Sequence, residues 1–518
     1  MARPLPSPRA ARSPFPLRVA CIDIGSNGIR CVAAEYRDPG HAQVLLQDRA
    51  PVRLGHSVFQ AGAIDREAMD AAVTGLAAFR RRLDALKVAH LRCVATSAVR
   101  ESANQSELLL RARREAKVKV EVIHGAEEAR LVHSAVSHRV PMGKDPWMLM
   151  DLGGGSLEVS LADGRGIRWS ESHAMGAVRL LEEFESCKGD TKRFQTLIAE
   201  TVGTLRIAGA KGRAPVGLAA TGGNIEELAR LSGLSEPEGG ASVLPVKQLR
   251  ETLQKVAKLD VAERMEKLDL RPDRADVVVP AGFVYEQVAR LAGVDAIHVP
   301  YVGLKDGVLL DLVDGLAVHT DAKARKETQV LDASVALGHR YQFDEEHGVH
   351  VSRLALSLFD QLQPRHRLKP IDRSILQAAA VLHDIGRFVG DAKHHKHSYY
   401  LVSQADLPGL SEQEVELAAQ VARYHRKKEP RVAHAPFAAL NAADQRRVTV
   451  LSAILRVADA LDREHRQAIR AVRLSRHGGN TTLKVQGDGS FTLEQWALEA
   501  KGGLFCRVFD TTLELEAP

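Results

Sequence analysis

The sequence contains few cysteines and no long apolar segment, and each shortage excludes a class of protein. The five cysteines are scattered, odd in number and without C-x-x-C spacing: Cys21, Cys31, Cys93, Cys187 and Cys506. This pattern excludes a disulfide framework and a cysteine zinc site, and it fits reduced thiols in a cytoplasm. No apolar run approaches the length that spans a bilayer. We therefore expect a cytoplasmic protein without a transmembrane segment.

Positive charge is in mild excess, and the chain is long enough for several domains. It has 518 residues and a formal net charge of +6. Residues 1–16 are rich in Pro and Arg and lack an apolar core, which predicts a disordered basic tail. Arginine clusters elsewhere are typical of solvated helix faces, so a polyanionic partner needs support from other motifs. We expect no specific nucleic-acid partner.

Residues 147–159 are the most informative stretch. An apolar run ends at Asp151, residues 153–156 read Gly-Gly-Gly-Ser, and an alternating run follows, which predicts strand, glycine turn and strand. Glycines let backbone N–H groups approach an anion, and an Asp beside them suits Mg²⁺. The same pattern occurs at residues 23–28. The pair predicts a duplicated unit with a phosphate site between its halves.

The first half of the chain alternates expected strands with expected helices, which predicts an α/β architecture. Strands are expected at 91–95, 118–122, 215–220 and 296–299, and helices at 65–86, 104–116, from 125, from 225 and up to about 312. The motifs that follow these strands lie at their C-terminal ends, where α/β sheets bind ligands.

The second half is expected to be almost entirely helical. Residues 316–325 are interpreted as a linker, and a small β-containing cap is expected from about residue 472. Between them the apolar periodicity predicts helices at 326–339, 344–363, 371–386, 411–425 and 444–465.

Six motifs together resemble the exopolyphosphatase / guanosine pentaphosphate phosphatase family of the actin–hexokinase–Hsp70 superfamily. They lie at 23–27, 95–100, 127–130, 151–156, 220–224 and 303–307, and the resemblance covers roughly residues 17–515. It implies a fold of two actin/hexokinase/Hsp70-like (ribonuclease H-like) α/β lobes, an all-α HD-type domain and a small α+β cap. The expected boundaries are 17–136 and 137–318 for the lobes, 319–471 for the helical domain and 472–518 for the cap.

The resemblance implies that the lobes close on a polyphosphate chain and release its terminal phosphate. Asp23 and Asp151 would hold Mg²⁺, and Glu128 would orient or deprotonate the attacking water. Glu127 remains an alternative, and Glu128 is chosen by its spacing to Asp151. The predicted phosphate-binding residues are Gly25, Ser26, Asn27, Arg100, Gly153, Gly154, Gly155, Ser156, Thr221, Gly222, Gly223, Asn224 and Lys305.

The helical domain carries a second candidate centre. His347, His383-Asp384 and Asp459 have the order of an HD phosphohydrolase domain, and His397 and His425 could supply a second metal position. Imidazoles and carboxylates on facing helices suit a divalent transition metal or Mg²⁺. The alternative is a set of hydrogen-bonded polar residues in a structural domain.

Inorganic polyphosphate is the expected substrate, and three alternatives stay open. Guanosine pentaphosphate could lose its 5′ γ-phosphate at the same site, with guanosine penta- and tetraphosphate as partners. The HD centre could act on nucleotides while the lobes sense polyphosphate or an alarmone. The chain could also bind these ligands as a regulator without turnover. The resemblance implies a homodimer.

Overall fold

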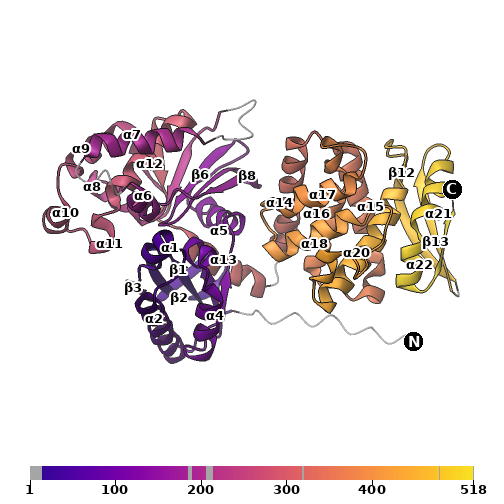
Figure 1. Ribbon diagram of the computed structural model, residues 1–518, viewed down its shortest axis with the longest axis horizontal. Helices are drawn as coiled ribbons and strands as arrows, with labels where there is room; N and C mark the ends of the chain where they lie inside the picture. Colours follow the sequence, from indigo (N-terminus) through magenta and orange to yellow (C-terminus); the bar gives the residue numbers. More distant parts are fainter. Residues whose placement is uncertain (1–14, 185–189, 206–213, 318–319, 478, 517–518) are drawn as a thin grey trace, which may run out of the picture. The chain divides into compact units, whose positions relative to one another are not determined.

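The computed structural model describes residues 15–184, 190–205, 214–317, 320–477 and 479–516 (Figure 1). Most of the predicted basic tail, and Cys187, lie outside these residues. The four described cysteines are free. Among the described residues, no helix is both long enough and apolar enough to cross a membrane. Contacts divide the chain into two compact units, Met1–Gly164 with Ser170–Ala324, and Arg325–Pro518 with Arg165–Trp169.

The first lobe of the first unit is built on a five-stranded mixed sheet in the order β3-β2-β1-β4-β5. Its strands are β1 (Leu17–Gly25), β2 (Gly28–Asp38), β3 (His41–Ala50), β4 (His90–Ala95) and β5 (Val120–Val122). The central strand β1 pairs antiparallel with β2 and parallel with β4. Being central, β1 is buried along nearly its whole length.

The second lobe repeats this topology with one added edge strand. Its sheet has the order β10-β11-β9-β6-β7-β8. The strands are β6 (Trp147–Leu152), β7 (Leu157–Asp163), β8 (Gly166–His173), β9 (Leu218–Thr221), β10 (Ser242–Pro245) and β11 (Ala296–Val299). Counted along the chain without β10, both sheets have the order 3-2-1-4-5, with β6 in the place of β1. The predicted duplication is confirmed.

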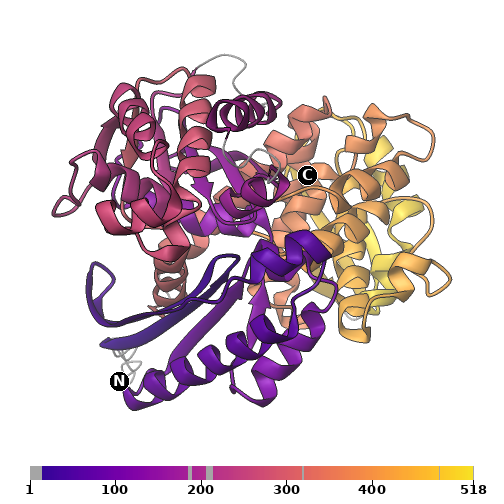
Figure 2. The same ribbon diagram turned by 60° about the vertical axis from the view of Figure 1, so that its left-hand side comes forward.

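Thirteen helices of the first unit are described. They are α1 (Leu54–Ala61), α2 (Arg66–Ala85), α3 (Ser97–Glu101), α4 (Gln105–Arg114), α5 (Gly125–Ser137), α6 (Ala177–Glu183), α7 (Thr191–Gly203), α8 (Gly223–Leu231), α9 (Val246–Val256), α10 (Val261–Leu268), α11 (Pro272–Ala275), α12 (Val278–Ala292) and α13 (Leu304–Ala317). Helix α2 starts as predicted, because the Asp65 side chain accepts a hydrogen bond from the Ala68 N–H. Figure 2 shows the helices of the first lobe running along its sheet.

Two of these helices are exchanged between the lobes. Helix α5 follows the first sheet in sequence but packs on β6 and β7 of the second, whereas α13 follows the second sheet but packs on β1, β2 and β4 of the first. The two helices also pack tightly on each other: a Cβ added to Gly307 of α13 would lie 1.9 Å from the Leu131 carbonyl oxygen of α5. Since Glu128 is on α5, this exchange carries it to the second sheet.

The second unit is a helical bundle followed by a small sheet (Figure 1). Its elements are α14 (Thr320–Arg340), α15 (Glu345–His366), α16 (Pro370–Leu382), the 3₁₀ helix η2 (Ile385–Phe388), α17 (His394–Ser403), α18 (Glu412–Arg423), α19 (Ala435–Ala438), α20 (Ala442–Ala460), β12 (Ile469–His477), β13 (Asn480–Gly487), α21 (Thr492–Lys501), α22 (Gly503–Phe509) and β14 (Thr512–Glu516). The sheet order is β12-β13-β14. One apolar core joins the bundle to the sheet, with Ile454 and Leu483 among its members.

Three predictions about these helices are corrected. The predicted linker 316–325 is helical except at residues 318–319, which lie outside the described residues; its Ala, Lys and Arg are good helix formers. The helix expected at 371–386 ends at Leu382, and η2 follows it. Residues 394–403 form helix α17, which was not among the helices predicted from the apolar periodicity.

Candidate active site

The two Asp–Gly loops lie against each other and line one cavity of about 700 Å³ in the first unit. Asp23 and Asp151 lie near the ends of the equivalent strands β1 and β6. The loops touch: a Cβ on Gly154 would lie 3.0 Å from the Ser26 Cβ. On Gly155 it would lie 2.5 Å from the Ser97 Oγ, so this position has no room for a side chain. The absence of side chains at these glycines is therefore what lets the loops meet.

Most of the residues predicted from sequence line this cavity. They are Asp23, Gly25, Ser26, Asn27, Glu128, Asp151, Gly153, Gly154, Ser156, Gly222, Gly223, Asn224 and Lys305. Three others do not: Gly155 is packed behind the loop, the Thr221 Oγ1 donates to the Asp151 Oδ1 at 2.6 Å, and Arg100 lies behind Glu128. The Thr221 hydroxyl is therefore bonded to a carboxylate, and its contact with phosphate stays a prediction.

Glu128 is a buried carboxylate at the cavity wall. The residue is 4% exposed, although it lies in the first turn of α5, where a solvated glutamate is the usual finding. Burial raises the pKa of Glu128 to about 7, against the lowering effect of Arg100. A carboxylate with this pKa is suited to take a proton from water near neutral pH.

The neighbouring Glu127 has a different environment. Its carboxylate pairs with Arg130 at 2.7 Å and with Arg92 at 3.1 Å. Burial raises its pKa, but these two cations outweigh burial and hold the pKa at about 2. Glu127 is absent from the cavity wall in the described part of the chain. Its geometry favours a structural ion pair and leaves Glu128 as the better candidate for a base.

Arg100 pairs with Glu128, whereas the sequence predicted that it contacts a phosphate. Its Nη1 donates to the Glu128 Oε1 at 2.8 Å and to the Ile123 carbonyl oxygen at 2.6 Å. The physical reason is the buried negative charge of Glu128, which is satisfied by the nearest guanidinium. The guanidinium of Arg100 is thus paired with the carboxylate of Glu128, and its contact with phosphate stays a prediction.

A pH profile tests this pairing. Ionised Glu128 is the form that accepts a proton, so kcat/KM should rise with pH through about 7. Because Arg100 lowers that pKa, Arg100→Gln should move the rising limb to higher pH, while Arg100→Lys should hold it closer to the original. A rising limb at the same pH in wild type and Arg100→Gln would contradict the assignment.

Glu158 was missed by the sequence reasoning. It faces Asp151 in the β6–β7 ladder, lines the cavity and accepts a hydrogen bond from the Ser172 Oγ at 2.8 Å. Burial, then the charges of Glu128 and Asp151, raises its pKa well above the usual range. The sequence could have indicated Glu158, because the loop length of the predicted hairpin places residue 158 opposite residue 151. In the first lobe the equivalent position opposite Asp23 is occupied by Arg30.

Five arginines on the cavity wall were also missed: Arg30, Arg49, Arg139, Arg271 and Arg274. Arg49 pairs with Asp273 at 2.6 Å and lies over Gly28, where any Cβ would meet its guanidinium at 2.7 Å. Arg274 is 6% exposed, and burial followed by the charge of Arg30 lowers its pKa to about 10. Its Nη1 donates to the Asn224 Oδ1 at 3.0 Å. Together with Lys305, these side chains place positive charge on the wall beside its carboxylates, and guanidinium groups are suited to pair with phosphate oxygens.

The acidic side of the cavity fits a hard divalent cation. Asp23 and Asp151 are buried, and burial raises the pKa of each carboxyl, with Asp23 raising that of Asp151 further. Neighbouring buried carboxylates repel each other, and a cation between them would relieve that repulsion. Carboxylates together with phosphate oxygens are the ligand set that Mg²⁺ prefers. The residues present therefore fit Mg²⁺.

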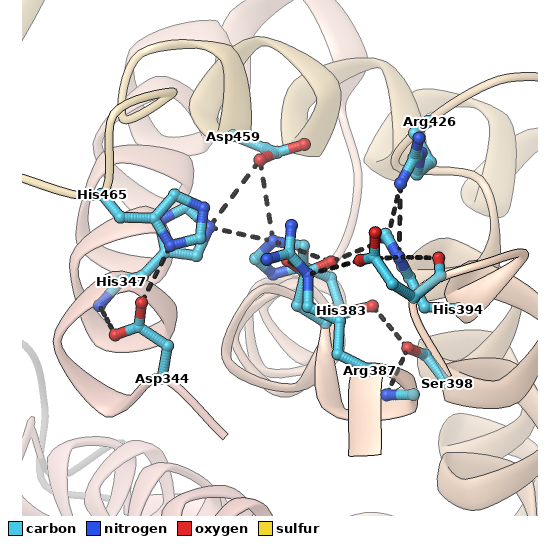
Figure 3. A network of polar contacts seen from close by, with 12 residues as sticks. Asp344, His347, His383, Arg387, His394, Ser398, Arg426, Asp459 and His465 are labelled. Atoms are coloured by element: carbon cyan, nitrogen blue, oxygen red, sulfur yellow. Dashed lines mark hydrogen bonds and ion pairs between the residues drawn. The ribbon is translucent and has the colours of Figure 1, made fainter. Parts of the chain in front are cut away.

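The second candidate centre is assembled in the second unit (Figure 3). His347, His383 and Asp459 form one group whose ligand atoms lie within 4.8 Å of one another, and Asp384, His394 and His425 form another. His397 is in neither group. Helix α17 turns its first residue, His394, into the core and leaves His397 half-buried. His465, which stacks on His347, was also missed.

The fold and the cavity together define a two-lobed enzyme of phosphoryl transfer. A family model described as the Ppx/GppA phosphatase family matches residues 33–316, and one described as Ppx/GppA phosphatase, domain III, matches residues 331–501. The chain belongs to the Ppx/GppA phosphatase family and is a hydrolase of phosphoanhydride bonds. The predicted fold class is confirmed, with two α/β lobes, a helical domain and a small C-terminal sheet.

Two kinds of relative share the family. A guanosine-5′-triphosphate,3′-diphosphate pyrophosphatase from Vibrio vulnificus is 28% identical, with 81% of this chain and 82% of the relative covered. The same protein from Aliivibrio fischeri is 27% identical, with 80% and 82% covered. An exopolyphosphatase crystal structure from Cytophaga hutchinsonii has a TM-score of 0.54 at 28% identity and covers 57% of this chain and 98% of its own. The Aquifex aeolicus family member has a TM-score of 0.50 at 26% identity and covers 59% and 99%.

Proposed function

We propose that this chain is a Mg²⁺-dependent exopolyphosphatase that hydrolyses the terminal phosphate from inorganic polyphosphate. The observation that carries the proposal is the place of Glu128, buried at the wall of a cavity that both Asp–Gly loops line. Hydrolysis of a terminal phosphate needs neutralisation of the phosphate charge and a positioned water, and little else from the enzyme.

The residues of the cavity have separable roles in this proposal. Loop N–H groups at Gly25–Asn27 and Gly153–Ser156 hold phosphate oxygens, while Lys305 and the wall arginines neutralise their charge. Glu128, fixed by Arg100, takes the proton of the attacking water. Asp23 and Asp151 would hold Mg²⁺, which supplies charge stabilisation on the transferring group when bound.

Guanosine pentaphosphate is the second candidate substrate at the same site. The observation that favours it is the similarity to the Vibrio and Aliivibrio pyrophosphatases over four-fifths of the chain, whereas the Cytophaga exopolyphosphatase favours polyphosphate. Both substrates present a terminal phosphoryl group to the same loops. Substrate choice therefore depends on what lies beyond that group.

Phosphate release from both substrates decides between them. With purified full-length chain and Mg²⁺, we expect kcat/KM for long polyphosphate to exceed that for guanosine pentaphosphate. Arg271→Gln removes a cation from the cavity wall. Measuring kcat/KM of this variant for both substrates shows whether the wall charge contributes more to the longer anion. A higher kcat/KM for guanosine pentaphosphate would replace the first proposal by the second. Binding of both without release would leave only a regulatory role.

A further inference from the structure

A hollow of about 570 Å³, the junction hollow, lies in the second unit where the helical bundle meets helix α22. Its wall comes from the last turn of α15, the segment from Pro430 to α19, the first half of α20 and the end of α22. Helices α20 and α22 pack on each other, as can be followed in Figure 1. Four segments that are distant in sequence therefore form one concave surface.

The junction hollow is separate from the His/Asp groups of the same unit. His347 lies in the first turn of α15, whereas Arg365, which lines the hollow, lies in the last turn. At 1.5 Å per residue, about 27 Å of helix separate the two. On α20 the hollow is lined by residues up to Val450, and Asp459 lies in the last turn. No described residue on the wall of the junction hollow belongs to those groups.

The floor of the junction hollow is apolar. Phe437, Val450 and Phe509 line it, are at most 6% exposed and belong to the apolar core of the unit. Val508 packs against that core, and Val432, which is 72% exposed, continues the apolar lining to the surface. A concave surface of this volume, apolar except for a few polar groups, has the properties of sites that bind small molecules.

Three arginines from three different segments line the same hollow. Arg365 lies on α15, Arg431 lies in the loop before α19, and Arg446 lies on α20. Among the described residues, no carboxylate lines the hollow or lies within 4.0 Å of these guanidinium groups. Cations that converge without a counter-ion repel one another. An anion bound in the hollow would remove that repulsion.

The carboxylates of the neighbouring segments pair with other cations. Asp372 and Asp444 both pair with Arg447, at 2.6 and 2.7 Å. Glu429, which directly precedes the hollow in sequence, pairs with Arg507. These acids are therefore already neutralised, and the positive charge of the junction hollow remains available to a ligand.

Backbone carbonyl groups hold two of the three arginines in place. The Arg446 Nη2 donates to the His366 carbonyl oxygen at 2.8 Å, and the Arg365 Nη2 donates to the Phe509 carbonyl oxygen. A carbonyl oxygen fixes the position of a guanidinium without cancelling its charge. Because a guanidinium has five N–H donors, both groups keep donors for a bound anion.

The charges around Arg365 show the same imbalance. Burial, followed by the charge of Arg476, lowers the pKa of Arg365, and the opposing effect of Asp510 is smaller. A lowered pKa means that the surroundings disfavour the charged form of this arginine. An anion placed against its guanidinium would favour that form again.

We propose that the junction hollow binds a small amphipathic anion, whose apolar body lies on Phe437 and Phe509 and whose carboxylate or phosphate head pairs with the three arginines. Guanidinium groups pair with both kinds of head. An anion without apolar surface, such as inorganic phosphate, would gain nothing from the floor, and a neutral apolar molecule would leave the arginine charges unbalanced. The site does not depend on hydrolysis at Glu128.

Isothermal titration calorimetry of the full-length chain tests which part of the ligand matters. The probes are decanoate, decyl phosphate, decanol and acetate, each below the concentration at which it aggregates or separates. We expect saturable binding of decanoate and of decyl phosphate, and at least tenfold weaker binding of decanol, which lacks the charge, and of acetate, which lacks the apolar body. Binding of decanol or of acetate as tightly as decanoate would overturn the proposal.

Arginine variants place the binding in the junction hollow. Arg431→Gln with Arg446→Gln should weaken decanoate and decyl phosphate at least tenfold, and the head that loses more is the one that the arginines prefer. Arg353→Gln is the matched control, because it removes an exposed arginine of α15 outside the hollow, and it should bind as wild type does. Equal melting temperatures of the variants and wild type show that all of them fold.

Three results would overturn the proposal. The first is that neither amphiphile binds saturably to wild type. The second is that the double variant binds both as tightly as wild type. The third is saturation by a soluble peptide rich in glutamate and leucine without saturation by either amphiphile, which would assign the junction hollow to a protein partner. None of these results bears on Glu128, which lies in the first unit.

Discussion

Replacing Glu128 by glutamine is expected to lower kcat for phosphate release by about 10²–10⁴-fold, the usual contribution of a positioned base. Glutamine keeps the size of the side chain but cannot take a proton from water. The amide oxygen of glutamine can still accept the hydrogen bond from Arg100, so the variant should fold, and thermal unfolding of the variant is the check. The measurement is phosphate release from polyphosphate and from guanosine pentaphosphate under saturating Mg²⁺.

The matched comparison is Glu127→Gln in the same helical turn. Glu127 pairs with Arg92 and Arg130, so its loss should lower thermal stability and leave kcat of the folded enzyme within a few-fold of wild type. The assignment fails if Glu128→Gln keeps a tenth of wild-type activity, or if Glu127→Gln is the variant that collapses.

Gly307→Ala is expected to destabilise the first unit strongly. The added Cβ would lie 1.9 Å from the Leu131 carbonyl oxygen, a backbone atom that cannot rotate away. Forcing α5 and α13 apart should cost at least the ~1–3 kcal/mol typical of overpacking. With about 2–4 °C of melting temperature per kcal/mol in a unit of this size, Tm should fall by several degrees. Activity should fall as well, because α5 carries Glu128.

Gly315→Ala on the same helix provides the control. A Cβ there meets nothing within 4 Å. Alanine is the better helix former by up to about 1 kcal/mol, so Tm should stay constant or rise. Equal Tm shifts in the two variants would show that the helix contact does not set the stability.

Local signals in the sequence predicted the two Asp–Gly loops well. The strand before Asp151 and the glycines after it depend on neighbours in sequence, and so does the start of α2 at Asp65. The repeat of the loop at residues 23–28 was enough to predict two equivalent sheets, and the structure confirms them.

Features that depend on pairing in space were not predicted. By charge alone, Arg100 could pair with a phosphate or with a carboxylate. Only the fold shows that the carboxylate of Glu128 lies next to the guanidinium. Arg49 and Arg274 come from a strand and a short helix that carry no motif. His394 and His397 lie three residues apart on one helix, and the rotation of that helix, set by packing, decides which of them faces inward.

The exchange of α5 and α13 means that the lobes are not independent folding units. Cutting the chain near residue 137 would leave Leu131 and Val132 of α5 without the surface they cover, and Val308 and Leu309 of α13 would lose theirs. Each excised half would expose one apolar helix and one uncovered sheet face, and exposed apolar surface promotes aggregation. The hydrolytic cleft should therefore assemble only when both halves belong to one chain or are produced together.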